Sequence, residues 1–346
     1  MLSVVLFAVL PTILWAAKEF AWNQALPGYH YQFPRDHFEH EDFRTEWWYY
    51  TGNVVDEGGK RFGFELVFFR QGVAPGEDNK SVWTLKNAYL GHAALTDASG
   101  KRFLYEEKLN RSGPGIAGAS FQERKVWNAN WSATWTQGDR QTLRAITPKF
   151  RLQLELEPEK GFVIQGENGV SQKADGVGMA SHYVSFPRLR VKGSIDSHQV
   201  TGTAWMDHEW FSNQLAADQL GWDWFSIQLE NGTELMLYRF RKSGGGLDTH
   251  SSGIFVDKDG KARHLTYKEF ALVPGAARHG KYPVEWQVQV PSLGIDLACR
   301  PVLANQELAP KNGSVGYWEG AVDFSGSQKG VGYLEMTGYD GKSPLR

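Results

Sequence analysis

The sequence has little cysteine and little net charge, and both shortages narrow the choice of fold and function. A single cysteine, Cys299, excludes an internal disulfide framework. The 37 basic and 39 acidic residues leave a formal net charge of -2, so no general attraction to nucleic acid or to an anionic membrane is expected. A phosphate-binding loop, a nucleophile elbow and a paired-cysteine metal motif are also missing from the sequence.

Runs with a helical period are scarce as well, whereas aromatic residues and glycine are abundant. The chain has 14 Trp, 13 Tyr, 20 Phe and 38 Gly, a mixture that favours strands and turns. From Thr45 onward, short aromatic or β-branched runs, such as residues 47–55 and 61–70, are separated by Gly, Asn and Asp turns. This spacing is typical of an antiparallel meander and predicts an all-β protein built of barrels or sandwiches.

Long hydrophobic runs are limited to the amino terminus. Residues 2–17 are apolar and uncharged, and the run is too short to span a bilayer comfortably. It is similar to the apolar region of a secretory signal, although a basic segment before it is missing and Trp15 interrupts the small residues at its end. We therefore expect a signal peptide at residues 1–17 and export of the protein.

The chain repeats itself once. Three pairs of segments are alike and occur in the same order. These are residues 46–70 with 223–241, 95–101 with 255–261, and 192–206 with 318–336. We therefore predict two similar barrels, at residues 18–215 and 216–346, with the boundary near residues 213–221.

The hexapeptide at residues 205–210, Trp-Met-Asp-His-Glu-Trp, is the most informative stretch. On a strand, alternating side chains place Trp205, Asp207 and Glu209 on one face and His208 and Trp210 on the other. A strand that lines a ligand cavity explains polar groups on both faces. The alternative is that the acids face solvent and the imidazole is a hydrogen-bonded core histidine. The second half of the chain has Thr337-Gly338-Tyr339 at this place, so chemistry is expected in the first barrel or in the cleft between the two.

Several motifs together resemble the AttH-type lipocalin-like family, which is related to carotenoid 1,2-hydratases. The likeness extends from about Phe33 to Tyr339. It rests on residues 33–37, 46–53, 182–185, 202–212, 317–321 and 332–339. The resemblance implies two tandem lipocalin-like, calycin-type antiparallel barrels in a bacterial exported protein, which places it in the periplasm. For some relatives it also implies hydration of an isolated isoprenoid double bond without an organic cofactor.

The resemblance also suggests site residues. Hydratase-like relatives use the His and Trp of an Asp-His-x-Trp motif, here His208 and Trp210, and a Tyr-x-Asp pair on a following strand. That strand has Tyr238 here, but Phe240 stands where the aspartate is expected. The proton would then have to come from Asp207, Glu209 or Asp223, because a buried carboxyl can stay protonated near neutral pH.

These considerations give a set of candidate residues. The catalytic candidates are His208, Trp210, Asp207 and Tyr238, and the ligand-binding candidates are Trp47, Trp205, Glu209, His182, Tyr183, Trp222 and Trp224. For His182 and Tyr183 a surface loop is the alternative, and for Asp207 or Glu209 a buried ion pair with an arginine such as Arg70 or Arg241.

Two further acidic features are expected to be structural. Glu46 and Asp223 occupy equivalent places in the repeat, so we expect them to accept hydrogen bonds at each barrel entrance. Residues 36–42, with alternating acids and histidines, match no standard metal site and are expected to be a solvated face. No metal or organic cofactor is expected.

Two functions remain open. One is an exported carrier of an isoprenoid or lipid-like molecule, associated with a membrane transport system. The other is a cofactor-free hydratase or isomerase. The missing aspartate near Tyr238 favours the carrier, and the presence of His208 and Trp210 favours the enzyme.

Overall fold

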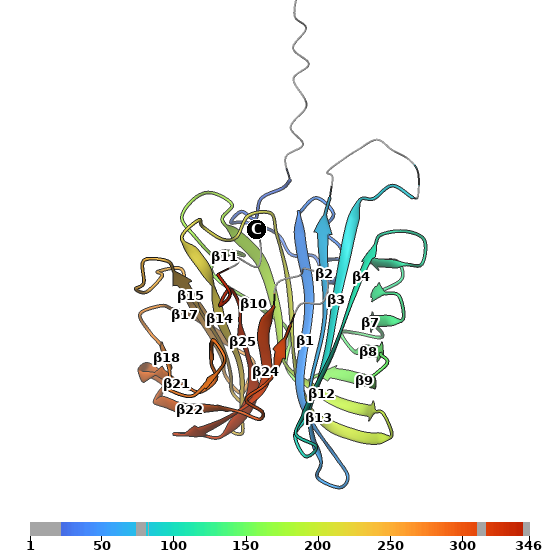
Figure 1. Ribbon diagram of the computed structural model, residues 1–346. Coiled ribbons are helices and arrows are strands. Elements are labelled where there is room, and N and C mark those ends of the chain that lie inside the picture. The colour runs from blue at the N-terminus through green and yellow to red at the C-terminus, as the bar shows by residue number, and fades with distance from the viewer. Residues whose placement is uncertain (1–21, 74–80, 82, 310–315, 342–346) are drawn as a thin grey trace, which may run out of the picture.

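The computed structural model describes residues 22–73, 81, 83–309 and 316–341. The all-β prediction is confirmed, because two large antiparallel sheets, each curled into a barrel or half-barrel, make up most of the molecule (Figure 1). Two single 3-10 turns, η1 (Arg35–His37) and η2 (Pro291–Leu293), accompany the strands. Within the described residues, no helix has the length and apolarity needed to cross a membrane. The expected signal peptide at residues 1–17 lies outside the described residues.

The first sheet has 13 strands, and the longest of them, β1, β2, β12 and β13, lie near the second sheet. Its path runs β4-β3-β2-β1-β13-β12-β9-β8-β7-β6-β5, with β10 and β11 paired to β12. The strands are β1 (Thr45–Asp56), β2 (Arg61–Gly72), β3 (Asn87–Asp97), β4 (Arg102–Arg111), β5 (Ala117–Ser120), β6 (Lys125–Asn128), β7 (Trp131–Trp135), β8 (Gln141–Ile146), β9 (Arg151–Pro158), β10 (Val163–Ile164), β11 (Ser171–Gln172), β12 (Ala180–Ile195) and β13 (His198–Phe211).

The second sheet has ten strands in the path β17-β16-β15-β14-β25-β24-β22-β21-β18, with β23 paired to β24. A separate hairpin joins β19 (Arg278–His279) and β20 (Tyr282–Pro283). The strands of the sheet are β14 (Gln219–Leu229), β15 (Glu234–Lys242), β16 (Ser252–Val256), β17 (Ala262–Thr266), β18 (Ala271–Pro274), β21 (Trp286–Val290), β22 (Ile295–Pro301), β23 (Glu307–Leu308), β24 (Tyr317–Gly326) and β25 (Gly330–Met336).

The two sheets have the same plan. The order β4-β3-β2-β1-β13-β12 in the first matches β17-β16-β15-β14-β25-β24 in the second. The repeated acids also have equivalent partners, since Glu46 faces Arg70 across β1 and β2, and Asp223 faces Arg239 across β14 and β15. The chain leaves the first sheet at Phe211 and enters the second at Gln219.

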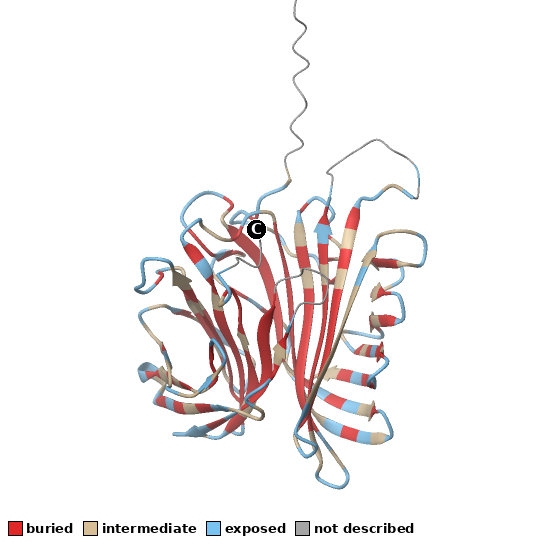
Figure 2. Cartoon of the chain, viewed as in Figure 1, coloured by how far each residue is buried: buried red, intermediate tan, exposed pale blue. Residues whose placement is uncertain are grey.

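Three apolar clusters explain why strands at the centre of the molecule are buried on both faces (Figure 2). One cluster fills the first barrel, with residues such as Trp48 and Phe68, and another fills the second, with residues such as Trp286. The third lies between the sheets and joins Tyr49 and Trp205 of the first to Trp224 of the second. Apolar side chains therefore pack the interiors of both barrels.

Close approach of the two sheets depends on a glycine in β2. A Cβ atom on Gly63 would lie 2.7 Å from both Ala321 Cβ and the Tyr333 hydroxyl. These distances are shorter than van der Waals contact, so a larger residue here would push β24 and β25 away.

Candidate functional site

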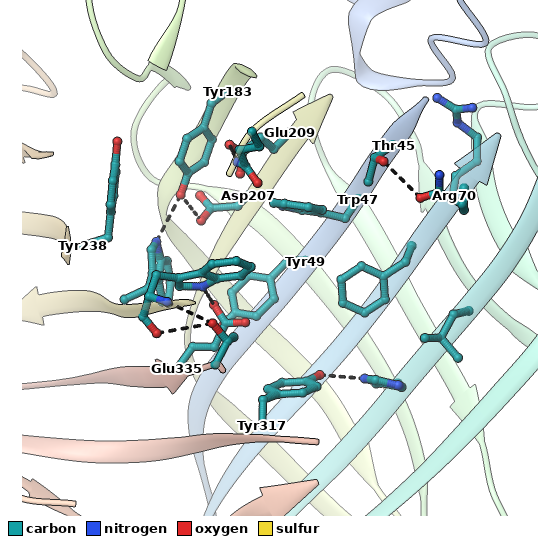
Figure 3. A pocket seen from close by; sticks show the side chains of 18 of the residues that line it. Thr45, Trp47, Tyr49, Arg70, Tyr183, Asp207, Glu209, Tyr238, Tyr317 and Glu335 are labelled. Carbon is teal, nitrogen blue, oxygen red and sulfur yellow. Dashed lines mark hydrogen bonds between the residues drawn. The ribbon is translucent and has the colours of Figure 1, made fainter. Parts of the chain in front are cut away.

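A cavity of about 420 Å³ lies between the two sheets rather than inside either barrel (Figure 3). Its walls come from β1, β2, β3, β4, β12 and β13 of the first sheet and from β14, β15, β24 and β25 of the second. Aromatic side chains form most of the surface, and a few acids are set among them. The principal aromatic residues are Trp47, Tyr49, Phe69, Tyr183, Trp222, Trp224, Tyr238 and Phe240.

Asp207, on β13, is the central acid of the first wall. Three side chains donate hydrogen bonds to its carboxylate: Ser185 Oγ at 2.5 Å, the Tyr183 hydroxyl at 2.5 Å and Trp205 Nε1 at 2.7 Å. Burial raises the pKa of Asp207 to about 7, even though these three donors favour the charged form. Trp224 of the second sheet donates in turn to the Tyr183 oxygen at 3.1 Å, so this network crosses the cavity.

Glu335, on β25, is the acid of the opposite wall. It lies directly across from Trp224 in the ladder, and its Oε2 accepts a hydrogen bond from Trp222 Nε1 at 2.7 Å. Burial, together with the neighbouring carboxylates of Glu209 and Asp207, raises the pKa of Glu335 to about 7. Figure 3 shows Asp207 and Glu335 on the two sides of the same aromatic space.

Glu209 differs from these two acids because a cation pairs with it. Lys173 Nζ lies 3.1 Å from Glu209 Oε1 and 4.3 Å from the centre of the Tyr238 ring. Burial works against the charge on Lys173, but the Glu209 carboxylate outweighs it and the pKa of the amine is raised. An ion pair for one of the two acids on β13 was expected, but its partner is Lys173 rather than Arg70 or Arg241. Those arginines pair with Glu46 and Asp223.

Two more buried acids sit where the sheets meet. The Tyr317 hydroxyl donates to Glu65 Oε1 at 2.7 Å, and the Tyr49 hydroxyl donates to Glu319 Oε1 at 2.6 Å. Burial raises the pKa of both carboxyls. The Glu335 carboxylate also acts to raise both pKa values, and the Glu65 carboxylate acts to raise that of Glu319. Tyr317 also lies 2.7 Å from His92 Nδ1, and both line the cavity. This junction is therefore rich in carboxyls that hold their protons near neutral pH.

His208 and Trp210 lie on the other face of β13, away from the cavity. His208 Nε2 is 2.9 Å from Glu46 Oε1, its ring stacks on Trp48 at 4.8 Å, and burial lowers its pKa to about 4. Trp210 stacks on His40 at 3.9 Å between ring centres. The alternation predicted for this strand is therefore present. It places His208 and Trp210, which the family resemblance suggested, on the opposite face of β13 from Asp207 and Glu209.

His182 also points away from the cavity. Its Nδ1 lies 3.0 Å from the Gly169 carbonyl oxygen, its ring packs beside Tyr29, and burial lowers its pKa to about 4. Both His182 and Tyr183 belong to the buried strand β12, so neither is on a surface loop.

Residues 36–42 were expected to be a solvated face, and only Glu41 and Asp42 at the end of the segment are exposed. Asp36, His37 and His40 are all nearly inaccessible. His40 lies between two acids, with Nδ1 2.7 Å from Glu46 Oε1 and Nε2 3.4 Å from Asp36 Oδ1. The expectation failed for Asp36 because the buried His40 imidazole, rather than solvent, lies beside its carboxylate.

Three donor atoms in this region are close enough to hold a metal ion. His40 Nδ1, Glu46 Oε1 and His208 Nε2 lie within 4.8 Å of one another, and all three residues are buried. Both histidine nitrogens are at hydrogen-bond distance from the carboxylate, which also pairs with Arg70 Nε at 2.9 Å. The guanidinium already supplies a positive charge here, so we interpret the group as a charge network that closes the end of the first barrel.

The structure thus brings together some predicted residues and not others. Asp207, Glu209, Tyr238, Trp47, Tyr183, Trp222 and Trp224 line the cavity, Trp205 supports it through Asp207, and His208, Trp210 and His182 lie elsewhere. The second half also contributes polar groups to the cavity, through Tyr238, which was a candidate, and Glu335, which was not. Glu335 could have been found by counting alternate positions along the repeat of the 205–210 strand. Lys173, His92 and Tyr317 carry no such signal.

A pair of lipocalin-like barrels with an acid-bearing aromatic cavity between them defines the class of this protein. A model of the AttH-like family matches residues 24–339, and the chain belongs to that family. A solved AttH protein from Nitrosomonas europaea is 32% identical, with a TM-score of 0.82 over 92% of this chain and 99% of that one. Kievitone hydratase from Nectria haematococca is 14% identical, with a TM-score of 0.69 over 92% and 98%, and shares the fold. A search of the curated proteins found no match.

Proposed function

We propose that this protein binds an apolar molecule with an isolated double bond in the cavity between its barrels and adds water to that bond without an organic cofactor. The observation that carries the proposal is the pair of buried acids, Asp207 and Glu335, whose pKa values are each raised to about 7 on facing walls of an aromatic cavity. The fold that this chain shares with kievitone hydratase, a hydratase by name, is consistent with it.

The hydrogen bonds assign different roles to the two acids. Asp207 accepts three, which favour its carboxylate, whereas the described residues provide Glu335 with the single indole donor of Trp222. Glu335 is therefore the better proton donor and Asp207 the better base. The Glu335 proton adds to one alkene carbon and leaves a tertiary cation at the other. Water bonds to that cation, and the proton that water loses passes to Asp207.

The aromatic walls suit this sequence of steps. Indole and phenol faces attract cations through their π-systems, and the rings of Trp47, Trp224 and Tyr49 surround the place where the cation would form. They also exclude bulk water, so water reaches the cation only from sites that the polar groups hold.

A carrier without chemistry is the second candidate, and one observation favours it. Phe240 lines the cavity at the position where the hydratase-like pattern has an aspartate, so that acid is replaced by an apolar wall. In this role the protein would be exported and would pass its ligand to a membrane transport system. Export itself remains a proposal based on the apolar run at residues 2–17.

Organic extraction of the purified protein and mass spectrometry of the extract identify the bound molecule. The recovered alkene is then incubated in water enriched in heavy oxygen with the wild type, Glu335→Gln and Asp207→Asn. The hydratase predicts heavy oxygen in the product and a fall in kcat of roughly 10²- to 10⁴-fold in either variant. The exposed Glu155→Gln serves as the control. If the ligand is unchanged after incubation with every protein, the hydratase is rejected and the carrier is the remaining candidate.

A further inference from the structure

Apolar side chains are exposed at the end of the first sheet where β2 ends and β3 begins. Val73, Trp83, Leu85 and Leu109 are between 42% and 60% exposed. They are four of the eleven strongly exposed large apolar side chains among the residues that the structure describes. Such a concentration in one place is unusual for a surface that meets only water.

Hydrogen bonds link the segments that carry these four side chains into one surface, which we call the rim. The Val73 amide donates to the Lys86 carbonyl at 2.9 Å, next to Leu85, and the Arg111 guanidinium donates to the Trp83 carbonyl. Leu109 lies two residues before Arg111 on β4. Leu109 also lines the cavity, so the rim is continuous with the apolar interior of the site.

Basic side chains surround the rim. Lys86 and Arg111 are exposed on it, and the exposed Arg44 is joined to it because its carbonyl accepts the Gly72 amide at 2.7 Å. Two exposed acids lie at the same edge, Glu41, which accepts a 3.4 Å hydrogen bond from Asn87, and its neighbour Asp42. Among the described residues the three positive charges outnumber these two acids, which suits an anionic lipid surface. The net charge of the protein gives no general attraction, so binding must depend on this rim.

The start of the described chain lies at the same edge. A Cβ atom on Gly72 would lie 2.3 Å from the Trp22 ring, so the first described residue packs beside Val73.

We propose that the rim docks on an anionic membrane and that an apolar ligand passes between the lipid and the cavity past Leu109 of the rim. An exposed tryptophan among aliphatic side chains, flanked by arginine and lysine, is the composition of a surface that enters the lipid headgroup layer. The direction of ligand transfer rests on the proposed function, but the docking itself does not.

Co-flotation with vesicles of phosphatidylglycerol and phosphatidylcholine tests the docking. Trp83→Ser and Leu85→Ser should each weaken binding about tenfold, since each removes an apolar side chain that enters the lipid. Lys86→Gln should weaken it roughly fivefold, and only when phosphatidylglycerol is present. Val73→Ser and Val55→Ser form a matched pair, because these valines are 51% and 43% exposed and Val55 lies at the opposite end of the same sheet. Val73→Ser should weaken binding to the vesicles, and Val55→Ser should not.

Binding that is equal in all variants, or absent in the wild type, overturns the proposal. A rim variant that instead converts a dimer to a monomer in solution would assign the surface to a second copy of this chain. Because turnover can be measured on a detergent-dispersed alkene, a failure of docking remains distinct from a failure of the hydratase.

Discussion

Tyr49 and Glu319 are 270 residues apart in the sequence, and the Tyr49 hydroxyl donates a hydrogen bond of 2.6 Å to the Glu319 carboxyl across the junction of the two barrels. Tyr317 and Glu65 make the reciprocal contact, in which the second barrel donates to the first at 2.7 Å. All four residues are buried. The barrels are therefore joined by a reciprocal exchange of tyrosine donors and buried acids as well as by apolar packing.

Removal of the Tyr49 hydroxyl should destabilise the protein, because a buried carboxyl loses the donor that satisfies it. We expect Tyr49→Phe to lower the free energy of unfolding by about 1–3 kcal/mol. Tyr50→Phe is a matched control on the adjacent residue, since the buried Tyr50 hydroxyl has no hydrogen-bond partner among the described residues. That change should be neutral or stabilising. Urea unfolding of both variants measures the difference, and equal effects would show that the exchange contributes nothing.

Much of the fold could be predicted from the sequence because the pattern is local and repeated. The Glu46-Trp47 and Asp223-Trp224 pairs start equivalent strands, and each acid meets an arginine of the next strand. The alternation along residues 205–210 also predicted which side chains share a face. What failed was the assignment of faces to environments, because a strand buried on both sides gives no sign of which side holds the cavity.

The site could be predicted only in part, since it is assembled from segments far apart in the sequence. Glu335 and Asp207 face the same space only because the outward surfaces of two barrels meet. Lys173 reaches Glu209 from β11 and its following turn, a pairing that no local spacing indicates. The surroundings of His208 likewise depend on His40 and Glu46, which pack against it from the amino-terminal segment and β1.

The buried acids should make the protein less stable as the pH rises. The pKa values of Asp207 and Glu335 are raised to about 7 in the folded state from 3.8 and 4.5, so the folded protein retains protons that the unfolded chain releases. Their stabilising contribution is fully present below about pH 4 and is lost as the pH rises through about 7. Asp207 contributes up to about 4 kcal/mol and Glu335 up to about 3 kcal/mol to this change.

Glu335→Gln should flatten that dependence, because the amide keeps the Trp222 hydrogen bond and does not ionise. The free energy of unfolding, measured by urea titration from acid to mildly alkaline pH, should fall less for Glu335→Gln than for the wild type. The exposed Glu155→Gln should follow the wild type. A Glu335→Gln curve parallel to the wild-type curve would mean that folding does not raise the pKa of Glu335.

His208 should be required for stability rather than for turnover. His208→Gln disturbs the hydrogen bond with Glu46 and the stacking on Trp48, so we expect a loss on the order of 2 kcal/mol. Turnover per folded molecule should be retained, because the ring faces away from the cavity. Calorimetric melting combined with kcat measured well below the melting temperature separates the two effects. A stable His208→Gln protein without turnover would show that the reaction takes place inside the first barrel rather than in the cavity between the sheets.

The Lys173–Glu209 pair should be strongly coupled, because both side chains are almost completely buried. Lys173→Met leaves the Glu209 carboxylate without its cation and should cost roughly 3–5 kcal/mol. Lys173→Met combined with Glu209→Gln removes both charges, while Ser181 and Gln214 can still donate to the amide oxygen. The double variant should therefore recover most of the loss, and a double-mutant cycle by urea unfolding measures the coupling. If the losses in the free energy of unfolding are additive, water rather than Lys173 stabilises the Glu209 carboxylate in the folded protein.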